Sequence, residues 1–363
     1  MSDKKIATLT FHRAINYGAV LQAYALQKSI EKFGYDTEIL DYRSDFLEKL
    51  HNPHDLRKYK SILRYGYAIL RNSVKKDNRR AFYSFSEKYL KLSKVYNREN
   101  IKDAADEYKA VIVGSDQVWN YNCTNFDKTY FLDFLPDGKQ KYSYAASVGI
   151  KLESPEIRNE YKRLLSDFSV RSVREAQAQK ELEKLGLSAE VALDPTLLLK
   201  PEEWRKIATA PKKKPGKYLL VYVITATPTI FSAAKKISQK FGLQIIYINE
   251  FLFNKPGVKN VSKITPTEWL WLFDNAEYIV TNSFHGTAFS VNFKKQFYVE
   301  PLPVKTNVNS RIYDLLAILD LQNRIIDSPE KINFGSINYD DINFDRHRTK
   351  SFESLKKTIE QIN

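Results

Sequence analysis

The sequence predicts an α/β protein of two doubly wound domains, with a basic helical insertion in the first domain. Three observations lead to this fold class. Short apolar runs alternate with stretches of helical spacing in both halves of the chain, which is typical of parallel sheets covered by helices. The chain has 363 residues, enough for two domains of roughly 150 residues each. Breaks at Asp194–Thr196 and at the proline- and lysine-rich Pro211–Gly216 are typical of a boundary between domains.

The first half opens with a βαβ unit. A strand is expected over 6–11, a helix with apolar spacing over 20–33, and a second strand over 37–40. The alternation stops from 43 to 100, where the helical stretches 56–72 and 79–90 indicate an insertion. Beyond it, strands are expected at 110–113, 141–147, 168–173 and 190–193, and helices at 155–165 and 175–185.

The second half repeats the rhythm. The capping box Thr265–Glu268, with proline at the first helical position, predicts a helix start. Strands are expected at 218–224, 244–249, 278–281 and 296–299, with helices at 228–241 and 310–319. We therefore expect domains over 1–193 and 194–345, and a C-terminal helix, 346–363, that crosses back to the first domain. A ligand is expected in the cleft between the domains, at the carboxyl ends of the strands.

The composition excludes several classes of protein. Hydrophobic residues make up 43% and charged residues 28% of the chain, as in globular domains. One cysteine, Cys123, forms neither an internal disulfide nor an all-cysteine metal site. No run of about 18 apolar residues occurs, and the apolar stretch 6–11 is too short for a signal peptide. We therefore expect a soluble cytoplasmic protein.

The charge favours anionic partners. Lys plus Arg number 57 against 43 Asp plus Glu, a net charge of +14. The segment 43–100 holds 15 basic and 6 acidic residues and so supplies +9 of this excess. Nucleic acid, phospholipid headgroups and phosphorylated small molecules all fit such a charge. Nucleic acid is not expected, because the sequence contains no recognised binding motif.

Four loops follow predicted strands, which is where α/β domains place function. The first, 12–18, precedes a helix N-terminus whose N–H groups can bind an anion, and Arg13 adds positive charge. This indicates phosphate or carboxylate binding. The alternative is a strand-to-helix turn, with Asn16 as cap and Gly18 for close packing.

The second loop, Gly114–Asn120, combines small polar side chains with a tryptophan. An indole face stacks on a pyranose while amides bond to its hydroxyls, so Asp116, Gln117 and Trp119 suggest a sugar-binding wall. In the alternative, Asp116 caps a helix and Trp119 belongs to the core. The residue types favour neither interpretation.

The third loop places Arg174 at the end of a strand, just before a helix N-terminus. A guanidinium in this place is suited to grip a carboxylate or a phosphate with two hydrogen bonds. The alternative is a surface ion pair with a neighbour such as Glu175 or Glu181.

The fourth loop, Thr281–Thr287, contains His285 at the start of a predicted helix. The helix dipole disfavours a cationic histidine there, so His285 is a candidate proton donor. Gly286 allows a ligand to approach the backbone. The alternative is a buried, hydrogen-bonded histidine.

Together these strings resemble the polysaccharide pyruvyl transferase family, over most of the chain. Each string is weak alone, and their order and spacing are specific. The strings are Thr10–Leu26, Gly114–Asn120, Tyr144–Ser147, Ser172–Glu175, Leu193–Thr196, Asn282–Thr287 and Ser310–Ile312.

The resemblance implies two Rossmann-like domains in a glycosyltransferase-B-like arrangement. It also implies transfer of a pyruvyl group from phosphoenolpyruvate to a hexose of a polysaccharide or glycolipid precursor, giving a cyclic ketal and phosphate. His285 matches the family's catalytic acid, and Arg174 matches an arginine that holds the donor. We expect the acceptor saccharide at Asn16, Tyr17, Asp116, Gln117 and Trp119. The chemistry requires no metal and no cofactor, and the sequence shows no histidine–carboxylate spacing typical of a metal site.

One position departs from the family pattern. Better-known members carry an arginine two residues before the histidine, where this chain has Ser283. Arg311, Arg13 or Lys305 could replace the missing charge, and we expect Arg311 and Arg13, with Ser283, at the donor site. The runner-up function is a nucleotide-sugar glycosyltransferase of the same architecture, in which Arg174 and Arg311 hold a diphosphate.

The basic insertion suggests one further partner. Glycolipid acceptors are presented on anionic bilayers, and each basic residue near such a surface adds about 1 kcal/mol of attraction. We therefore expect peripheral contact with the inner membrane face. A solvated helical hairpin with an aromatic core side is an equal alternative.

Overall fold

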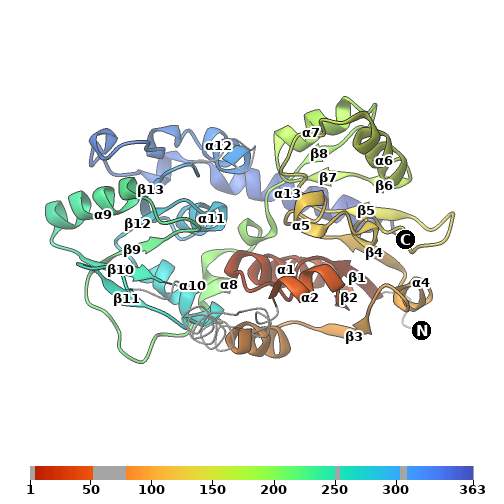
Figure 1. Cartoon of the computed structure of the whole chain (residues 1–363), viewed down its shortest axis with the longest axis horizontal. Coiled ribbons are helices and arrows are strands. Elements are labelled where there is room, and N and C mark those ends of the chain that lie inside the picture. The colour runs from red at the N-terminus through yellow and green to blue at the C-terminus, as the bar shows by residue number, and fades with distance from the viewer. Residues whose placement is uncertain (1–4, 52–78, 250–253, 303–308, 363) are drawn as a thin grey trace, which may run out of the picture.

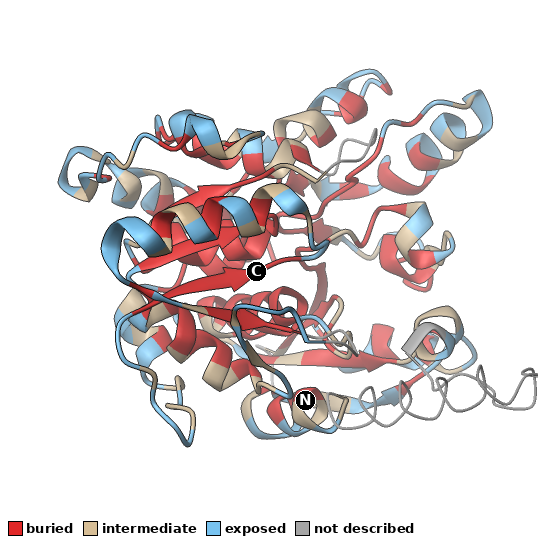
Figure 2. Cartoon of the chain, turned by 60° about the vertical axis from the view of Figure 1, so that its left-hand side comes forward, coloured by how far each residue is buried: buried red, intermediate tan, exposed pale blue. Residues whose placement is uncertain are grey.

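The computed structural model describes residues 5–51, 79–249, 254–302 and 309–362 of the chain. It confirms the predicted fold class, with two α/β domains side by side (Figure 1). Buried residues concentrate on the central strands and on the inward faces of the helices (Figure 2).

The first domain is built on a six-stranded parallel sheet of order β3-β2-β1-β4-β5-β6. The central strands β1 and β4 are apolar and almost entirely buried, as strands covered by helices on both faces require. The strands are β1 (Lys5–Leu9), β2 (Asp36–Tyr42), β3 (Leu92–Tyr96), β4 (Ala110–Val113), β5 (Lys141–Ser143) and β6 (Phe168–Val170).

Helices and a small second sheet complete this domain. The stretch expected as one strand over 168–173 is divided, because β7 leaves the main sheet to pair with β8. These two strands are β7 (Ser172–Val173) and β8 (Glu190–Val191). The helices are α1 (Tyr17–Glu31), α2 (Asp45–His51), α4 (Ala104–Glu107), α5 (Tyr121–Thr124), α6 (Pro155–Leu165) and α7 (Ala176–Glu183).

The insertion 43–100 is only partly helical in the described residues. Residues 79–89 form a helix, and its Phe82 and Phe85 are buried in the core. The insertion then returns as β3, an edge strand that was not predicted. Its burial is low, so the apolar alternation that reveals a strand is weak there. The helix expected over 56–72 lies outside the described residues.

The second domain contains a five-stranded parallel sheet of order β11-β10-β9-β12-β13. Its edge strand β11 was not predicted; it has three residues, too few to show a period. The strands are β9 (Tyr218–Tyr222), β10 (Gln244–Ile248), β11 (Lys259–Val261), β12 (Tyr278–Thr281) and β13 (Gln296–Val299). The helices are α8 (Pro201–Arg205), α9 (Pro228–Phe241), α10 (Pro266–Asn275), α11 (Phe284–Asn292) and α12 (Ser310–Ala317).

The C-terminal helix α13 (Phe344–Glu360) lies against the first domain. Its Leu355 and Ile359 are buried among residues of β1, α1 and β4. The ring of Phe352 packs on Phe33, with the centroids 4.7 Å apart. The end of the chain therefore ties the two domains together.

In both sheets the strand order reverses beside the first strand of the domain, at β1 and β4 in one and at β9 and β12 in the other. Loops that leave the carboxyl ends of such strands form the usual ligand crevice of this fold class. The loops after β1, β4 and β12 are three of the four selected from the sequence. Within the described residues, none of the helices is long and apolar enough to cross a membrane.

We predict that Leu355→Ala lowers the free energy of unfolding by about 2–5 kcal/mol, because it leaves a cavity under α13. Lys356→Ala, at the exposed neighbouring position, is the control and should change it by less than about 0.5 kcal/mol. Urea unfolding, monitored by circular dichroism, measures the free energy of unfolding of both variants. Equal effects of the two substitutions would show that α13 is not docked.

Candidate active site

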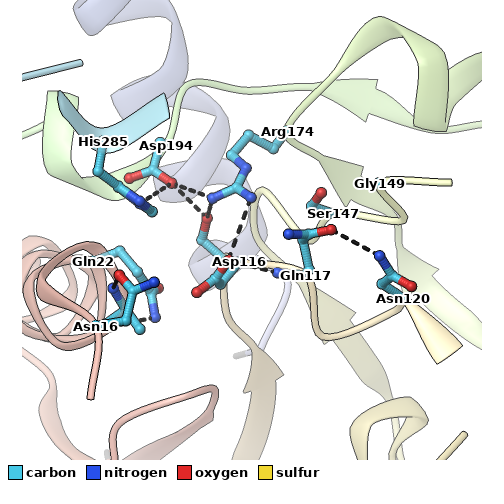
Figure 3. Close-up of polar contacts among 12 residues, drawn as sticks. Asn16, Gln22, Asp116, Gln117, Asn120, Ser147, Gly149, Arg174, Asp194 and His285 are labelled. Atoms are coloured by element: carbon cyan, nitrogen blue, oxygen red, sulfur yellow. Dashed lines mark hydrogen bonds and ion pairs between the residues drawn. The ribbon is translucent and has the colours of Figure 1, made fainter. Parts of the chain in front are cut away.

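The Asp194 carboxylate connects the two domains at the cleft. Its Oδ2 accepts hydrogen bonds from Arg174 Nη1 (2.7 Å) and Ser115 Oγ (3.0 Å) of the first domain. The same oxygen lies 3.6 Å from Nε2 of His285, which belongs to the second domain (Figure 3). Oδ1 accepts from the amide and the hydroxyl of Thr196, so both carboxylate oxygens are occupied.

This network keeps Asp194 ionised. The carboxylate is fully buried, and burial alone would raise its pKa. The nearby His285 and Arg174 outweigh burial and hold the pKa of Asp194 well below its usual range. Asp194 is therefore a fixed negative charge, and it is not a proton donor.

Arg174 is a buried cation with unused donors. Its side chain is 2% exposed, and its partners are Asp194 and, at 3.6 Å, Asp116. Arg174 therefore does not form the surface ion pair with Glu175 or Glu181 that was the alternative interpretation. Its Nε and Nη2 make no hydrogen bond to the described residues. Buried guanidinium donors that make no hydrogen bond suggest a site for an anion.

Arg311, in the first turn of α12, comes from the opposite domain and faces the same place. The guanidinium carbons of Arg174 and Arg311 lie 4.8 Å and 5.5 Å from the ring centroid of Phe284. Burial, together with the charge of Arg174, lowers the pKa of Arg311 to about 10. Two buried like charges disfavour each other, and a bound anion would relieve that repulsion.

His285 lies in the first turn of α11, which begins at Phe284. The loop before this helix is therefore shorter than the expected loop Thr281–Thr287. The side chain of His285 is 9% exposed, and Nε2 faces Asp194 without a hydrogen bond to the described residues. The ring rests on the backbone of α1 at Gly18, where a Cβ would come within 1.9 Å of Nδ1. Gly18 therefore serves close packing across the domain boundary.

A cavity of about 360 Å³ opens between the domains at this cluster. Its charged end contains Arg174, Arg311 and Asp194, with the Phe284 ring beside them, while most of the remaining wall is apolar. His285 does not line this cavity. Its Nε2 lies 3.6 Å from Oδ2 of Asp194, which does line it.

A second cavity, of about 440 Å³, lies in the first domain at the ends of β1, β2 and β4. Its wall combines neutral polar, charged and aromatic side chains, among them Phe11, Arg13, Asn16, Asp116, Gln117 and Asn122. Arg13 is paired there with Glu48 at 2.9 Å and stacks over Tyr83 at 4.4 Å. Arg13 thus lines a different cavity from Arg174 and Arg311, contrary to the expected donor role.

Asp116 lies between the two cavities. It lines the second one, and its Oδ1 is 3.6 Å from Nη2 of Arg174, which lines the first. Its backbone has φ +76°, a left-handed conformation that is strained for a residue other than glycine. Asp116 does not cap a helix; its carboxylate accepts from the amide of Gln117. The strained turn aims the side chain at Arg174.

Three of the expected site residues have structural contacts instead. Trp119 is fully buried, stacks on Phe131 and donates to the carbonyl of Tyr130, so it belongs to the core and not to a sugar-binding wall. Tyr17 is buried between the domains against Trp269 and is not an acceptor contact. Ser283 caps α11 by accepting from Gly286 N at 3.2 Å.

Asn16 caps α1 through its Oδ1, as one of the two interpretations expected, and the residue also lines the second cavity. Asp194 and Phe284 were missed as site residues. Both stand inside the strings quoted above, but Asp194 was interpreted as part of a domain boundary. Lys305 lies outside the described residues. Among the described residues, no three His, Cys, Asp or Glu side chains form a group that could hold a metal ion.

Comparisons with known proteins agree with this architecture. The model of the polysaccharide pyruvyl transferase family matches residues 16–300. No curated protein matches the chain. A solved UDP-N-acetylglucosamine 2-epimerase is similar with a TM-score of 0.52 at 12% identity, over 99% of this chain and 95% of that chain. A Listeria monocytogenes protein assigned as the same kind of enzyme has a TM-score of 0.51 at 11% identity, over 100% and 91%. These likenesses show the fold, a glycosyltransferase-B-like pair of Rossmann-like domains.

We predict that Asp194→Asn lowers the free energy of unfolding at pH 7 by about 3–5 kcal/mol, because it removes the closest charged partner of the buried Arg174. The folded pKa of Asp194 is depressed, so its contribution is present above the unfolded pKa of about 3.9 and is lost as the pH falls below it. The difference between the native chain and the variant should therefore shrink below about pH 4.

The control for this prediction is Asp274→Asn, which breaks a surface pair with Arg205. It should cost at most about 1 kcal/mol. Chemical unfolding between pH 3 and pH 8 measures all three chains. A constant difference between the native chain and Asp194→Asn across that range would contradict a depressed pKa.

We also predict that Gly18→Ala displaces His285, because the new Cβ would overlap the imidazole. The substitution should destabilise the chain by about 1–3 kcal/mol. Pairing it with His285→Ala, which removes the clashing ring, should recover part of that loss. A double-mutant cycle in urea provides the measurement, and strict additivity would argue against the contact.

Proposed function

The chain belongs to the polysaccharide pyruvyl transferase family, and we propose that it moves a pyruvyl group from phosphoenolpyruvate to a hexose of a polysaccharide or glycolipid precursor. The product would be a cyclic pyruvate ketal, with phosphate released. One observation carries this proposal. Two guanidinium groups from opposite domains, that of the buried Arg174 and that of the partly buried Arg311, flank the ring of Phe284 in a cavity whose Asp194 side adjoins His285.

The two arginines suit the donor. Phosphoenolpyruvate carries a carboxylate and a phosphate, so its site needs about two cations together with N–H donors. Arg174 supplies the unbonded Nε and Nη2, and Arg311 supplies the second charge. Arg311 thereby supplies the charge of the arginine that better-known family members carry at the position of Ser283. Ser283 itself caps α11.

His285 would protonate the methylene carbon of the donor, and oxocarbenium character would develop at C2. The first acceptor hydroxyl adds at C2, and a second hydroxyl of the same hexose displaces the phosphate. Of the two hydroxyl protons, one balances the proton delivered to the methylene and the other leaves with the phosphate. The donor's methylene would have to lie on the Asp194 side of the cavity, where Nε2 of His285 is placed.

Asp194 and Arg174 support this step without taking part in proton transfer. Asp194 remains ionised and orients His285, while Arg174 stays charged as the phosphate departs. A fixed positive charge that needs no rearrangement favours the transition state over the ground state.

We place the acceptor in the second cavity. Asn16, Asp116 and Gln117 offer amide and carboxylate groups to sugar hydroxyls, and Phe11 offers an aromatic surface. Asp116 joins this cavity to the donor side through its contact with Arg174. A hexose there would have its hydroxyls directed towards C2 of the donor.

We predict that phosphoenolpyruvate raises the melting temperature of the native chain and that Arg311→Met abolishes the shift. A ligand at 100 times its Kd stabilises the folded state by about 2.7 kcal/mol. His285→Ala should keep the shift and lose phosphate release in the presence of a hexoside panel, because it removes only the acid. Arg205→Met, on the surface, is the matched control and should behave like the native chain.

The same measurement tests the runner-up, a nucleotide-sugar glycosyltransferase, in which the two arginines hold a diphosphate. Stabilisation by UDP-N-acetylglucosamine, with none by phosphoenolpyruvate, would overturn the donor assignment. Unchanged phosphate release in His285→Ala would overturn the role of the histidine. Mass spectrometry of the panel should show the addition of one pyruvylidene group to the acceptor.

A further inference from the structure

The helix α12 presents two side chains to the first domain. Arg311 and Asp314 are three residues apart, so they lie on the same face of the helix about one turn from each other. Both line the cavity between the domains. Arg311 faces Arg174, while Asp314 Oδ2 accepts a hydrogen bond of 2.8 Å from the backbone N–H of Ala176.

This bond supplies a cap that α7 lacks within its own domain. The residue before the helix is Glu175, whose side chain makes no cap hydrogen bond. Its Oε1 instead accepts from Ser147 Oγ and from the amides of Val148 and Gly149. The first N–H of α7 is therefore satisfied by Asp314 of the second domain. A carboxylate at a helix N-terminus is also favoured by the helix dipole.

The position of this bond in the chain is informative. Ala176 is two residues after Arg174, and Asp314 is one helical turn after Arg311. The hydrogen bond thus pins α12 to the segment that holds Arg174 (Figure 1 shows α7 and α12 side by side across the domain boundary). It therefore keeps Arg311 close to Arg174, although the two like charges disfavour each other.

The same hydrogen bond explains why an acidic side chain, Asp314, lines the cavity in which we propose that an anion binds. A free carboxylate beside Arg311 would compete with the ligand for the guanidinium. Asp314 is directed instead to the N-terminus of α7, where its Oδ2 accepts from Ala176 N–H. Its carboxylate therefore stabilises the contact between the two domains.

We propose that Asp314 is a positioning residue, which holds Arg311 beside Arg174 for an anionic donor by capping α7 from the opposite domain. This inference rests on the proposed function in one respect, namely that the two arginines bind the donor anion together. It assigns Asp314 no contact with the reacting atoms.

The test compares Asp314→Ala, Asp314→Asn and a control, Glu183→Ala, in the full chain. Asn keeps an oxygen that can accept from Ala176 N–H, whereas Ala does not. Glu183 is an exposed acid at the far end of α7, so its removal matches the change in charge without touching α12. Hydrogen–deuterium exchange of the peptide containing Ala176 reports the cap. Calorimetric titration with phosphoenolpyruvate, and separately with inorganic phosphate, reports the anion site.

In Asp314→Ala, we expect faster exchange at Ala176 and affinity for both anions about tenfold lower, the effect of one lost charge-assisted hydrogen bond. In the pyruvyl transfer assay, the KM for phosphoenolpyruvate should rise while kcat changes less. Asp314→Asn should restore most of both readouts, and Glu183→Ala should leave them unchanged. A structural role alone would lower the melting temperature without separating KM from kcat.

Each outcome decides a specific point. Native anion affinity in Asp314→Ala, despite faster exchange at Ala176, would overturn the proposal, because the cap would then not position Arg311. Unchanged hydrogen–deuterium exchange at Ala176 in Asp314→Ala would also overturn the proposal, because Asp314 would then not cap α7. If phosphate binds and phosphoenolpyruvate does not, the donor assignment fails while the phosphate titration still decides the role of Asp314. If neither anion binds the native chain, the paired-arginine site and this inference both fail.

Discussion

The Asp194 carboxylate, at the passage from the first domain to the second, is the charge on which the site depends. It is fully buried, and it accepts from Arg174 and Ser115 of one domain while facing His285 of the other. A buried ion pair of this kind is costly to break, because removal of one partner leaves the other charge without solvent or counterion. The carboxylate therefore fixes the arginine, the histidine and the relative position of the two domains at once.

Positive and negative charges lie close together in the cluster. Asp194 and Asp116 lie beside Arg174, and Arg311 adds a second cation, whose pKa is lowered to about 10 by burial and by the charge of Arg174. Two cations therefore face two carboxylates before any ligand binds, and Nε of Arg174 makes no hydrogen bond to the described residues. A dianion in the cavity would gain from both guanidinium groups in a low-dielectric site, where charge interactions are stronger than in water. The hydrogen bond from Ala176 N–H to Asp314, at the wall of the same cavity, holds the two domains together there.

Close approach of the backbones is the second constraint. The imidazole of His285 occupies the space where any side chain at position 18 would begin, so Gly18 is part of the site although it carries no functional group. The left-handed backbone at Asp116 similarly turns a carboxylate towards Arg174 at the meeting point of the two cavities. The missing side chain at Gly18 and the strained backbone at Asp116 are both local features, and the surrounding sheet and helices maintain them. One cavity lies between the domains, and a polar and aromatic cavity lies within the first domain.

The sequence by itself determined the two-domain α/β class, the elements with strong periodicity or caps, and the loops that contain Arg174 and His285. Helices α6 and α9 and strands β4, β12 and β13 have the predicted bounds, because proline starts and continuous apolar runs are local signals. The edge strands β3 and β11 escaped prediction, since short strands of low burial carry little pattern. Only the tertiary structure decided that Trp119 and Tyr17 are buried, that Arg13 belongs to another cavity, and that Asp194 is shared by two domains. These outcomes depend on contacts between residues far apart in the chain, which no local spacing of residue types encodes.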